Sequence, residues 1–366
     1  MVNFHYECDL AIIGAGPAGL RAAVAAAESG ASVILLDRDL SLGGQLIKQT
    51  HMFFGSQKQH ASVRGIDIAG ILLDEIEKHD KIKVLPGATA LGMYEDGMLT
   101  AEHKGKYIKI KARAFIVATG ASEKFLTFPN NDLPGIYGAG AVQTLMNVYG
   151  VTPGDNVVMV GAGNIGLIVS YQLVQAGVNV RAVIDAAQTI GGYLVHASKI
   201  RRMGVPIYTG HTVKQAHGTD KLEKVTLIEL DKNWKQIEGT EKDIEADVLC
   251  ISVGLSPLGE LLWQMGCEMK YIPELSGHVP VRNVEHQTSV KNVFVCGDVA
   301  GVEEASSAMV GGSLAGLCAA KYLGFDRPDF EEQKADCLSQ FNDLRSGPVG
   351  ERILSGIHKI ECGGVQ

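Results

Sequence analysis

Short apolar runs that end in glycine-rich turns recur along the chain and indicate parallel β-strands, each followed by a helix. Residues 9–13 are the first such run, and the turn GAGPAG at residues 14–19 follows directly. This order of strand, GxGxxG turn and helix is typical of a dinucleotide-binding βαβ unit. The pattern predicts a helix over residues 21–29 and a second strand over residues 32–36, which ends at Asp37.

Each glycine of this turn has its own physical role. Gly14 permits the tight turn, and Gly16 lets the backbone approach a pyrophosphate. Gly19 allows the new helix to pack closely on the strand. The unpaired amides at the start of that helix bind phosphate, and Asp37 can accept hydrogen bonds from ribose hydroxyls.

The same pattern returns in the middle of the chain. An apolar run at residues 156–160 leads into the turn GAGNIG at residues 161–166, and a helix is predicted over residues 167–175. The following strand, residues 179–184, ends in Asp185, with no arginine in the next three positions. A carboxylate repels a 2′-phosphate and binds free hydroxyls, so this second site favours NAD(H) over NADP(H).

Two further apolar runs predict buried strands, one before and one after the second glycine turn. Residues 115–120 form an apolar run that ends in a small-residue turn, and residues 293–298 form another that ends in Gly-Asp. A helix is predicted over residues 305–322, so the first and last thirds of the chain are expected to form one domain. The tail is predicted to be helical to Leu344, with a break at residues 346–350 before a short final helix.

Composition narrows the classes of function. The length of 366 residues favours two domains, and no run of about 18 apolar residues indicates a membrane span. A formal net charge of −8 disfavours nucleic-acid binding, which depends on clustered basic residues. No basic segment precedes an apolar one at the N-terminus, so we expect a cytoplasmic protein.

The cysteines show no spacing typical of a dithiol or a metal site. They are Cys8, Cys250, Cys267, Cys296, Cys318, Cys337 and Cys362. We interpret them as small buried apolar residues and predict no metal site.

Seven motifs in this order resemble the two-dinucleotide-binding flavoproteins, which include thioredoxin reductase and the pyridine nucleotide-disulphide oxidoreductases. The motifs are residues 14–19, Asp37, 43–46, 118–120, 161–166, 252–257 and 297–298. The resemblance implies an α/β fold with two Rossmann-like dinucleotide-binding domains, the NAD domain inserted into the FAD domain. The expected boundaries are 1–122 and 284–325 for the FAD domain, 123–283 for the NAD(H) domain and 326–366 for a C-terminal helical extension.

The resemblance also implies which residues bind the two cofactors. The FAD residues would be Gly14, Gly16, Pro17, Ala18, Gly19, Asp37, Arg38, Gly44, Gln45, Ala90, Ala118, Thr119, Gly120, Gly297, Asp298, Ser306 and Ser307. The NAD(H) residues would be Gly161, Gly163, Asn164, Ile165, Gly166, Asp185 and Gly254. In this assignment Gln45 lies near the flavin and Asp298 binds its ribityl chain.

The chain departs from the disulphide reductases of this superfamily. Where thioredoxin reductases carry a CxxC, residues 138–141 read GAGA, and residues 45–51 lack the cysteines of the larger reductases. Dithiol chemistry is therefore not expected.

Residues 133–145 and 150–154 resemble a narrower group of flavoprotein subunits. This group contains the A chain of opine oxidase, the B chain of hydrogen cyanide synthase and the alpha chains of sarcosine oxidase and dye-linked proline dehydrogenase. Many of these proteins carry a cysteine-rich segment for an iron-sulphur cluster, which this sequence lacks. The resemblance implies a second flavoprotein or electron carrier as partner, and an oligomer.

Two residues near the expected flavin ring are candidates for chemistry. His51 could shuttle a proton, and Lys48 could stabilise an anionic reduced flavin. We favour the alternative that His51 is a hydrogen-bonded wall residue and Lys48 a solvated one, because hydride transfer mainly needs alignment of the cofactors.

We therefore expect an FAD-dependent oxidoreductase that exchanges hydride with NAD(H) as the electron-transferring subunit of an amine or amino-acid dehydrogenase. A stand-alone NADH oxidase or NADH-dependent reductase is one alternative, and a nucleotide-binding scaffold without turnover is another.

Overall fold

The chain forms two compact units. The computed structural model describes residues 4–53 and 56–361. Unit 1 combines Met1–Ser122 with Ser256–Gln366, and unit 2 is Glu123–Leu255. The chain passes between the units in the short strands β7 (Ala121–Glu123) and β16 (Leu255–Pro257).

Unit 1 contains a seven-stranded sheet in the order β3-β2-β1-β6-β5-β4, with β19 also paired to β6. The strands are β1 (Phe4–Ile13), β2 (Val33–Asp37), β3 (Ile82–Pro86), β4 (Ala88–Met93), β5 (Met98–His103), β6 (Lys106–Val117) and β19 (Val293–Val295). The pairs among β3, β2, β1, β6 and β19 are parallel, whereas β5 runs antiparallel to both β4 and β6. The glycine turn that follows β1 therefore lies at the carboxyl edge of the parallel strands.

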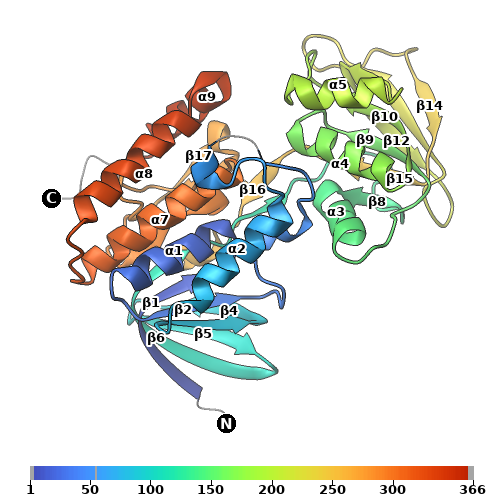
Figure 1. Ribbon diagram of the computed structural model, residues 1–366. Coiled ribbons are helices and arrows are strands. Elements are labelled where there is room, and N and C mark those ends of the chain that lie inside the picture. The colour runs from blue at the N-terminus through green and yellow to red at the C-terminus, as the bar shows by residue number, and fades with distance from the viewer. Residues whose placement is uncertain (1–3, 54–55, 362–366) are drawn as a thin grey trace. The chain divides into compact units, whose positions relative to one another are not determined.

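Alternate side chains of the central strand enter two apolar layers. Leu10 and Ile12 of β1 pack with helices α1 (Pro17–Glu28), α2 (Gly65–Glu77) and α7 (Ala305–Tyr322), which cover one face of the sheet (Figure 1). Ala11 and Ile13 enter the layer on the other face, together with residues of β4, β5 and β6. Burial on both faces explains why the end of this strand, residues 10–13, is a continuous apolar run.

Two glycines allow α7 to lie directly on α1. A Cβ atom at Gly312 would lie 2.1 Å from the carbonyl oxygen of Ala18, and one at Gly316 would lie 2.2 Å from that of Ala22. Both distances are shorter than any van der Waals contact, so only glycine permits this helix spacing. The first and last thirds of the chain are joined here.

The second crossing between units differs from the expected boundary at residue 283. Residues after Ser256 pack on unit 1, because Leu262 of α6 (Glu260–Gln264) is buried in the second apolar layer of its sheet. The hairpin of β17 (Met269–Ile272) and β18 (Gly277–Pro280) packs on α9 (Gly347–Ile357) through apolar residues. These segments are amphipathic pieces of unit 1, although they follow the inserted unit directly in sequence.

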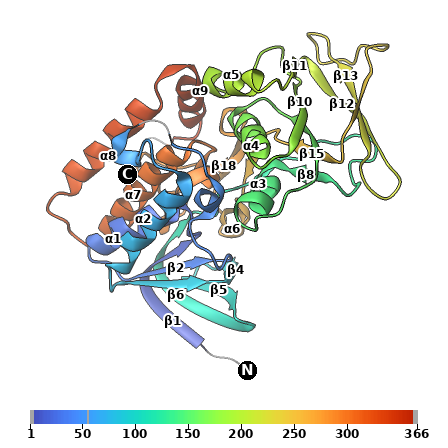
Figure 2. The ribbon, with the colours of Figure 1, turned by 45° about the vertical axis from the view of Figure 1, so that its right-hand side comes forward.

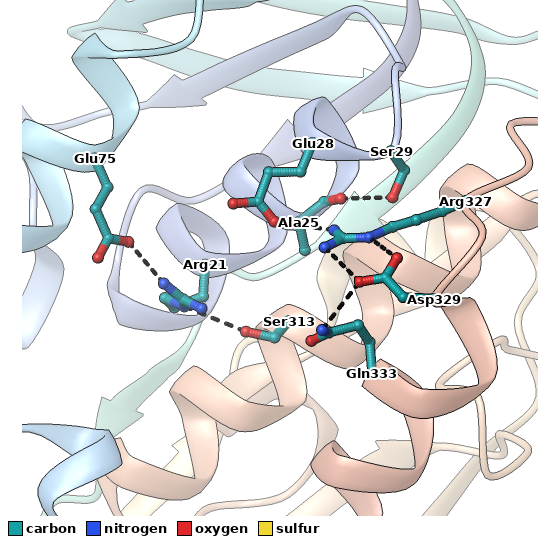
Figure 3. Close-up of polar contacts among 9 residues, drawn as sticks. All are labelled: Arg21, Ala25, Glu28, Ser29, Glu75, Ser313, Arg327, Asp329 and Gln333. Atoms are coloured by element: carbon teal, nitrogen blue, oxygen red, sulfur yellow. Dashed lines mark hydrogen bonds and ion pairs between the residues drawn. The ribbon is translucent and has the colours of Figure 1, made fainter.

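The C-terminal helices are part of unit 1. Helix α8 (Phe330–Leu344) packs on α7. Phe330 and Phe341 of α8 lie in the main apolar core of unit 1. Figure 3 shows how α1 is tied to its neighbours: Arg21 pairs with Glu75 of α2 at 2.6 Å and donates to Ser313 of α7 at 3.2 Å. Arg327, ahead of α8, pairs with Glu28 of α1 at 3.0 Å (Figure 3).

Unit 2 is a smaller Rossmann-like layer structure. Its parallel sheet has the order β11-β10-β9-β15-β8 and a separate antiparallel sheet has the order β12-β13-β14. The strands are β8 (Ile136–Gly138), β9 (Asn156–Val160), β10 (Asn179–Asp185), β11 (Ile207–Thr209), β12 (His211–His217), β13 (Lys224–Glu229), β14 (Lys242–Glu245) and β15 (Val248–Ile251). Helices α3 (Ala139–Asn147), α4 (Asn164–Gln175) and α5 (Leu194–Arg202) cover one face of the parallel sheet, and the antiparallel sheet covers the other (Figure 2).

Three helices begin earlier than the sequence pattern predicts. Helix α1 begins at Pro17 rather than residue 21, α4 at Asn164 rather than 167, and α9 at Gly347 rather than after residue 350. In α1 and α9 a proline occupies the first turn, where its missing N–H costs nothing. Across the described ranges 4–53 and 56–361, no helix is both long and apolar enough to cross a membrane.

Candidate functional site

The first glycine turn leaves a helix N-terminus open at the carboxyl edge of the unit 1 sheet. Gly14 has φ of +107°, and a Cβ there would lie 2.3 Å from the carbonyl oxygen of Ala118. Gly16 caps α1 with extended backbone, and within the described chain no side chain caps this helix. A Cβ at Gly16 would meet nothing closer than 3.9 Å, so this position has room for a ligand. Gly19 is different, because a Cβ there would lie 1.8 Å from the Gly14 carbonyl.

Asp37 holds the turn in place. One carboxylate oxygen accepts the N–H of Ala15 at 2.6 Å, and the other accepts the N–H of Asp39 at 2.9 Å. The backbone N–H of Gly14 donates to Leu36 at 2.8 Å. The acid expected to bind ribose thus also fixes the conformation of the glycine turn.

Two other predicted motifs of unit 1 converge on this turn. The N–H of Gly43 donates to the Ala15 carbonyl at 2.9 Å, and a Cβ at Gly44 would lie 2.8 Å from the Cα of Gly16. A Cβ at Gly297 would lie 2.9 Å from the Cβ of Ala18. The structure therefore brings the first turn, the Gly-Gly motif and the Gly-Asp motif together.

The remaining residues of the predicted FAD set are on several elements of unit 1. Gln45 is in the short 3-10 helix η1 (Gly44–Lys48), and Thr119 and Gly120 follow Ala118 after β6. Ser306 and Ser307 are buried in the first turn of α7. Arg38 is exposed directly after β2, and Ala90 packs on the sheet face opposite α1. Their roles stay predictions.

Asp298 is in the short helix η4 (Gly297–Ala300), after β19. Burial raises the pKa of Asp298 to about 7 from an ordinary value of 3.8. The N–H of Glu303, which donates to its carboxylate at 3.4 Å, lowers the pKa, and the charge of Glu303 raises it. A desolvated carboxyl group held by such a long hydrogen bond fits the predicted role of binding ligand hydroxyls.

We expect the raised pKa of Asp298 to make the flavin-free protein less stable as pH rises from about 4 to about 7. Between about pH 4 and pH 7 the folded state keeps a proton that the unfolded chain has lost, so unfolding becomes easier with increasing pH. An Asp298→Asn variant lacks this titration. Its melting temperature, relative to the unmodified protein, should increase from about pH 5 to about pH 8. Parallel pH profiles for the two proteins would contradict the assignment.

The second glycine turn, in unit 2, has the same backbone conformation and the same aspartate hydrogen bond as the first. Gly161 has φ of +108°, and a Cβ there would lie 2.0 Å from the Ser252 carbonyl. Asp185 accepts the N–H of Ala162 at 2.6 Å. Gly163 caps α4 without a side-chain cap in the described chain, and a Cβ there would have nothing within 4 Å. A Cβ at Gly166 would lie 2.0 Å from the Gly161 carbonyl, so Gly166 packs the helix as Gly19 does.

Of the other predicted residues of the second site, Asn164 and Ile165 are in the first turn of α4, and Gly254 follows β15. The Asn164 side chain accepts the N–H of Tyr193 at 2.8 Å, so the loop before α5 folds back on the turn. Ile165 is partly exposed in the first turn of α4. Gly254 has φ of +107°, and its carbonyl accepts the N–H of Lys124 at 2.9 Å.

Helix α3, to which the resemblance assigns the position of the CxxC in thioredoxin reductases, has a carboxylate at its N-terminus. In α3 the N–H of Gly140 donates to Glu123 at 2.6 Å. A Cβ at Gly138 would lie 2.2 Å from the other Glu123 oxygen, so the glycine makes room for the carboxylate. A negative charge at a helix N-terminus is favourable, and here it takes a position that would otherwise stabilise a thiolate.

The cysteines of the described residues are free thiols, and burial makes them hard to ionise. Burial raises the pKa of Cys8 and Cys296 to about 12 and that of Cys337 to about 11. Such thiols are poor nucleophiles at neutral pH, which supports a packing role. Cys362 lies outside the described residues.

The two candidates for chemistry, Lys48 and His51, lie in one loop of unit 1. Lys48 ends η1, and the His51 ring stacks on Phe53 with centroids 5.6 Å apart. This stacking is compatible with a structural role for His51 in the wall of the site, and its role in proton transfer stays a prediction.

Together, two units with glycine turns ahead of open helix N-termini define a protein with two dinucleotide-binding folds. The chain belongs to the pyridine nucleotide-disulphide oxidoreductase family, whose model matches residues 8–312. The predicted resemblance and the two-domain α/β fold class are thereby confirmed. A thioredoxin reductase from T. acidophilum has the same fold, with a TM-score of 0.71 and 24% identity over 86% of this chain and 98% of its own.

Two curated relatives belong to the narrower group expected from the sequence. The alpha chain of sarcosine oxidase from Corynebacterium sp. (strain P-1) is 30% identical over 89% of this chain. The A chain of opine oxidase from Agrobacterium tumefaciens (strain Ach5) is 27% identical over 85% of it. The chain spans 34% of the first relative's length and 65% of the second's. Both relatives are subunits of named oxidases.

Some residues around the site are not signalled by any motif. Glu303 and Arg345 form a nearly buried ion pair next to Asp298, and Glu123 caps α3. Their partners are distant in sequence, so spacing alone could not identify them.

Proposed function

We propose that this chain is an FAD-dependent oxidoreductase that exchanges hydride with NAD(H). The observation that carries the proposal is the pair of matching cradles, one in each unit. Each has an acid that holds the turn, an uncapped helix N-terminus, and one glycine with open space where a pyrophosphate would bind. Both cradles therefore fit a dinucleotide.

The residues of unit 1 would hold FAD, and those of unit 2 would hold NAD(H). The amides at the start of α1 would bind the FAD pyrophosphate, and Asp298 would accept hydrogen bonds from ribityl hydroxyls. Asp185 without a following arginine favours NAD(H) over NADP(H). When bound, the flavin and nicotinamide supply the redox chemistry, and the protein contributes alignment and exclusion of water.

We also propose that the chain acts as the electron-transferring subunit of an amine or amino-acid dehydrogenase. Support comes from relatives that are subunits of sarcosine and opine oxidases. The absence of cysteine at residues 138–141, with Glu123 bound there, supports electron transfer without a protein dithiol. A second flavoprotein or electron carrier would be its partner.

Anaerobic titration with NADH tests this proposal. We expect the purified protein to be yellow, and its flavin absorbance to bleach with about one equivalent of NADH and much less readily with NADPH. Fast turnover with oxygen or quinones by the isolated chain would favour a stand-alone oxidase or reductase. Bound FAD that NADH does not bleach would favour a scaffold, and a colourless protein unable to bind flavin would refute the proposal.

A further inference from the structure

A small cavity lies beside Asp298, on the side of unit 1 that faces the C-terminal helices. Its wall includes Arg282, His286, Glu303 and Arg345 along with Asp298. These side chains come from the turn after β18, the loop before α7 and the end of α8. Burying a charged side chain costs free energy unless the charge is paired. The ion pairs and hydrogen bonds among these side chains therefore indicate their role.

Arg345 and Glu303 form an ion pair in the wall of this cavity. Nε and Nη2 of Arg345 donate to the two carboxylate oxygens of Glu303 at 2.9 and 2.7 Å. The side chains are 9% and 11% exposed, so water screens this pair little. Bidentate pairing fixes the orientation of both groups as well as their separation.

The ion pair restrains Glu303, which contacts Asp298 directly. Glu303 lies between η4 and α7, and its backbone N–H donates to the Asp298 carboxylate at 3.4 Å. The N–H of Gly301 donates to the Asp298 carbonyl at 3.2 Å. Fixing the side chain of Glu303 therefore limits the positions open to Asp298.

A second contact from the same turn of α8 reaches the strand before Asp298. The Arg345 guanidinium lies 3.9 Å over the ring of Phe341, and this ring stacks on His286 with centroids 5.8 Å apart. His286 donates from Nδ1 to the carbonyl of Val295 at 2.9 Å, at the end of β19. Residues 341–345 thus reach the segment after the Gly-Asp turn through Glu303 and the strand before it through His286.

We infer that Arg345 is a positioning residue for the flavin site, and that it acts through Glu303 to hold Asp298 and the start of α7 in the arrangement that binds FAD. The inference rests on the proposed function, because it assigns FAD to Asp298. It gives the end of α8, in the expected C-terminal extension, a defined role inside unit 1.

Loss of Arg345 should weaken FAD binding and change the flavin itself. An Arg345→Met variant keeps the stem of the side chain and leaves the charge of Glu303 without its bidentate partner. We expect the dissociation constant of FAD to rise about tenfold, the effect of losing one hydrogen bond to a charged group. The reduction potential of bound flavin should fall, because an unpaired carboxylate disfavours negative charge on a reduced ring nearby.

Two further variants separate positioning from simple stability. Glu303→Gln in the Arg345→Met background removes the unpaired charge, so we expect the reduction potential to return toward that of the unmodified protein. Arg345→Lys keeps the charge without the bidentate geometry and should give an intermediate FAD affinity. It also provides a testable protein if Arg345→Met does not fold.

The matched control is Arg327→Met, ahead of the other end of α8. Arg327 pairs with Asp329 at 2.6 Å and with Glu28 at 3.0 Å (Figure 3), and other residues line the cavity beside Asp298. Its loss should lower the stability of unit 1 and leave FAD affinity and potential unchanged.

The measurements are FAD affinity by fluorescence, the flavin potential by dye equilibration, and unfolding of the flavin-free proteins by urea. Equal FAD affinity and equal potential in Arg345→Met and the unmodified protein would overturn the inference. So would an Arg327→Met variant that changes both properties to the same extent. Failure of the unmodified protein to bind FAD would instead refute the proposed function.

Discussion

A Gly163→Ala variant should keep its flavin and lose most of its affinity for NADH. The added methyl group has no protein atom within 4 Å, and the backbone of Gly163 is extended, so folding should be unaffected. The methyl group would instead enter the space where a pyrophosphate approaches the start of α4. Loss of one charge-assisted hydrogen bond costs about 1.5–3 kcal/mol, so the apparent KM for NADH should rise about tenfold or more.

Gly16→Ala is the matched variant in unit 1. A Cβ at Gly16 is also free of close contacts, with the nearest atom at 3.9 Å, and it would enter the first cradle. We expect this variant to be purified with little FAD and to keep its affinity for NADH, measured by isothermal titration of the flavin-free protein. If both variants lose the same cofactor, or if neither loses any, the assignment of one cofactor to each unit is wrong.

Gly316→Ala should destabilise unit 1 by about 3 kcal/mol, as expected for an overpacked helix contact. A Cβ at this position would lie 2.2 Å from the carbonyl oxygen of Ala22, and a backbone oxygen in a helix cannot move aside as a side chain can. The two helices would have to separate, with loss of contacts in the main core. Equilibrium unfolding in urea, followed by circular dichroism, measures the change.

Gly70→Ala provides the control for this variant. Gly70 is also inside a helix, α2, but a Cβ there has nothing within 4 Å. The higher helix propensity of alanine should make this variant more stable by up to about 1 kcal/mol. Similar losses in both variants would show that helix packing against α1 is not the reason for glycine at residue 316.

The strand and glycine patterns predict the two nucleotide folds well, because their signals are local. A buried parallel strand is a continuous apolar run, and a turn such as that of Gly14 or Gly161 requires positive φ. The acids Asp37 and Asp185 are also predicted, since each is the last residue of its strand. Their hydrogen bonds to the backbone of the turns depend on three-dimensional contact and become visible only in the structure.

Features that depend on distant partners are not predicted. The antiparallel strands β4 and β5 contain short and mixed polar runs, and they are stabilised by pairing rather than by their own pattern. The second boundary between units is similarly hidden, because α6 and the β17–β18 hairpin gain their burial from unit 1. Arg345 and Glu303 are 42 residues apart, and nothing in their local sequence indicates that they meet.

Unit 1 consists of two separate segments of the chain, and this affects the order in which the parts of the protein can fold during synthesis. Strand β19 and helix α7, which complete the sheet and cover of unit 1, emerge from the ribosome only after the whole of unit 2. Translation at about 5–20 residues per second leaves the N-terminal strands without these neighbours for roughly ten seconds or more. Unit 2 is one continuous segment and can fold during this interval. The first glycine turn, although it is made first, acquires its final surroundings last.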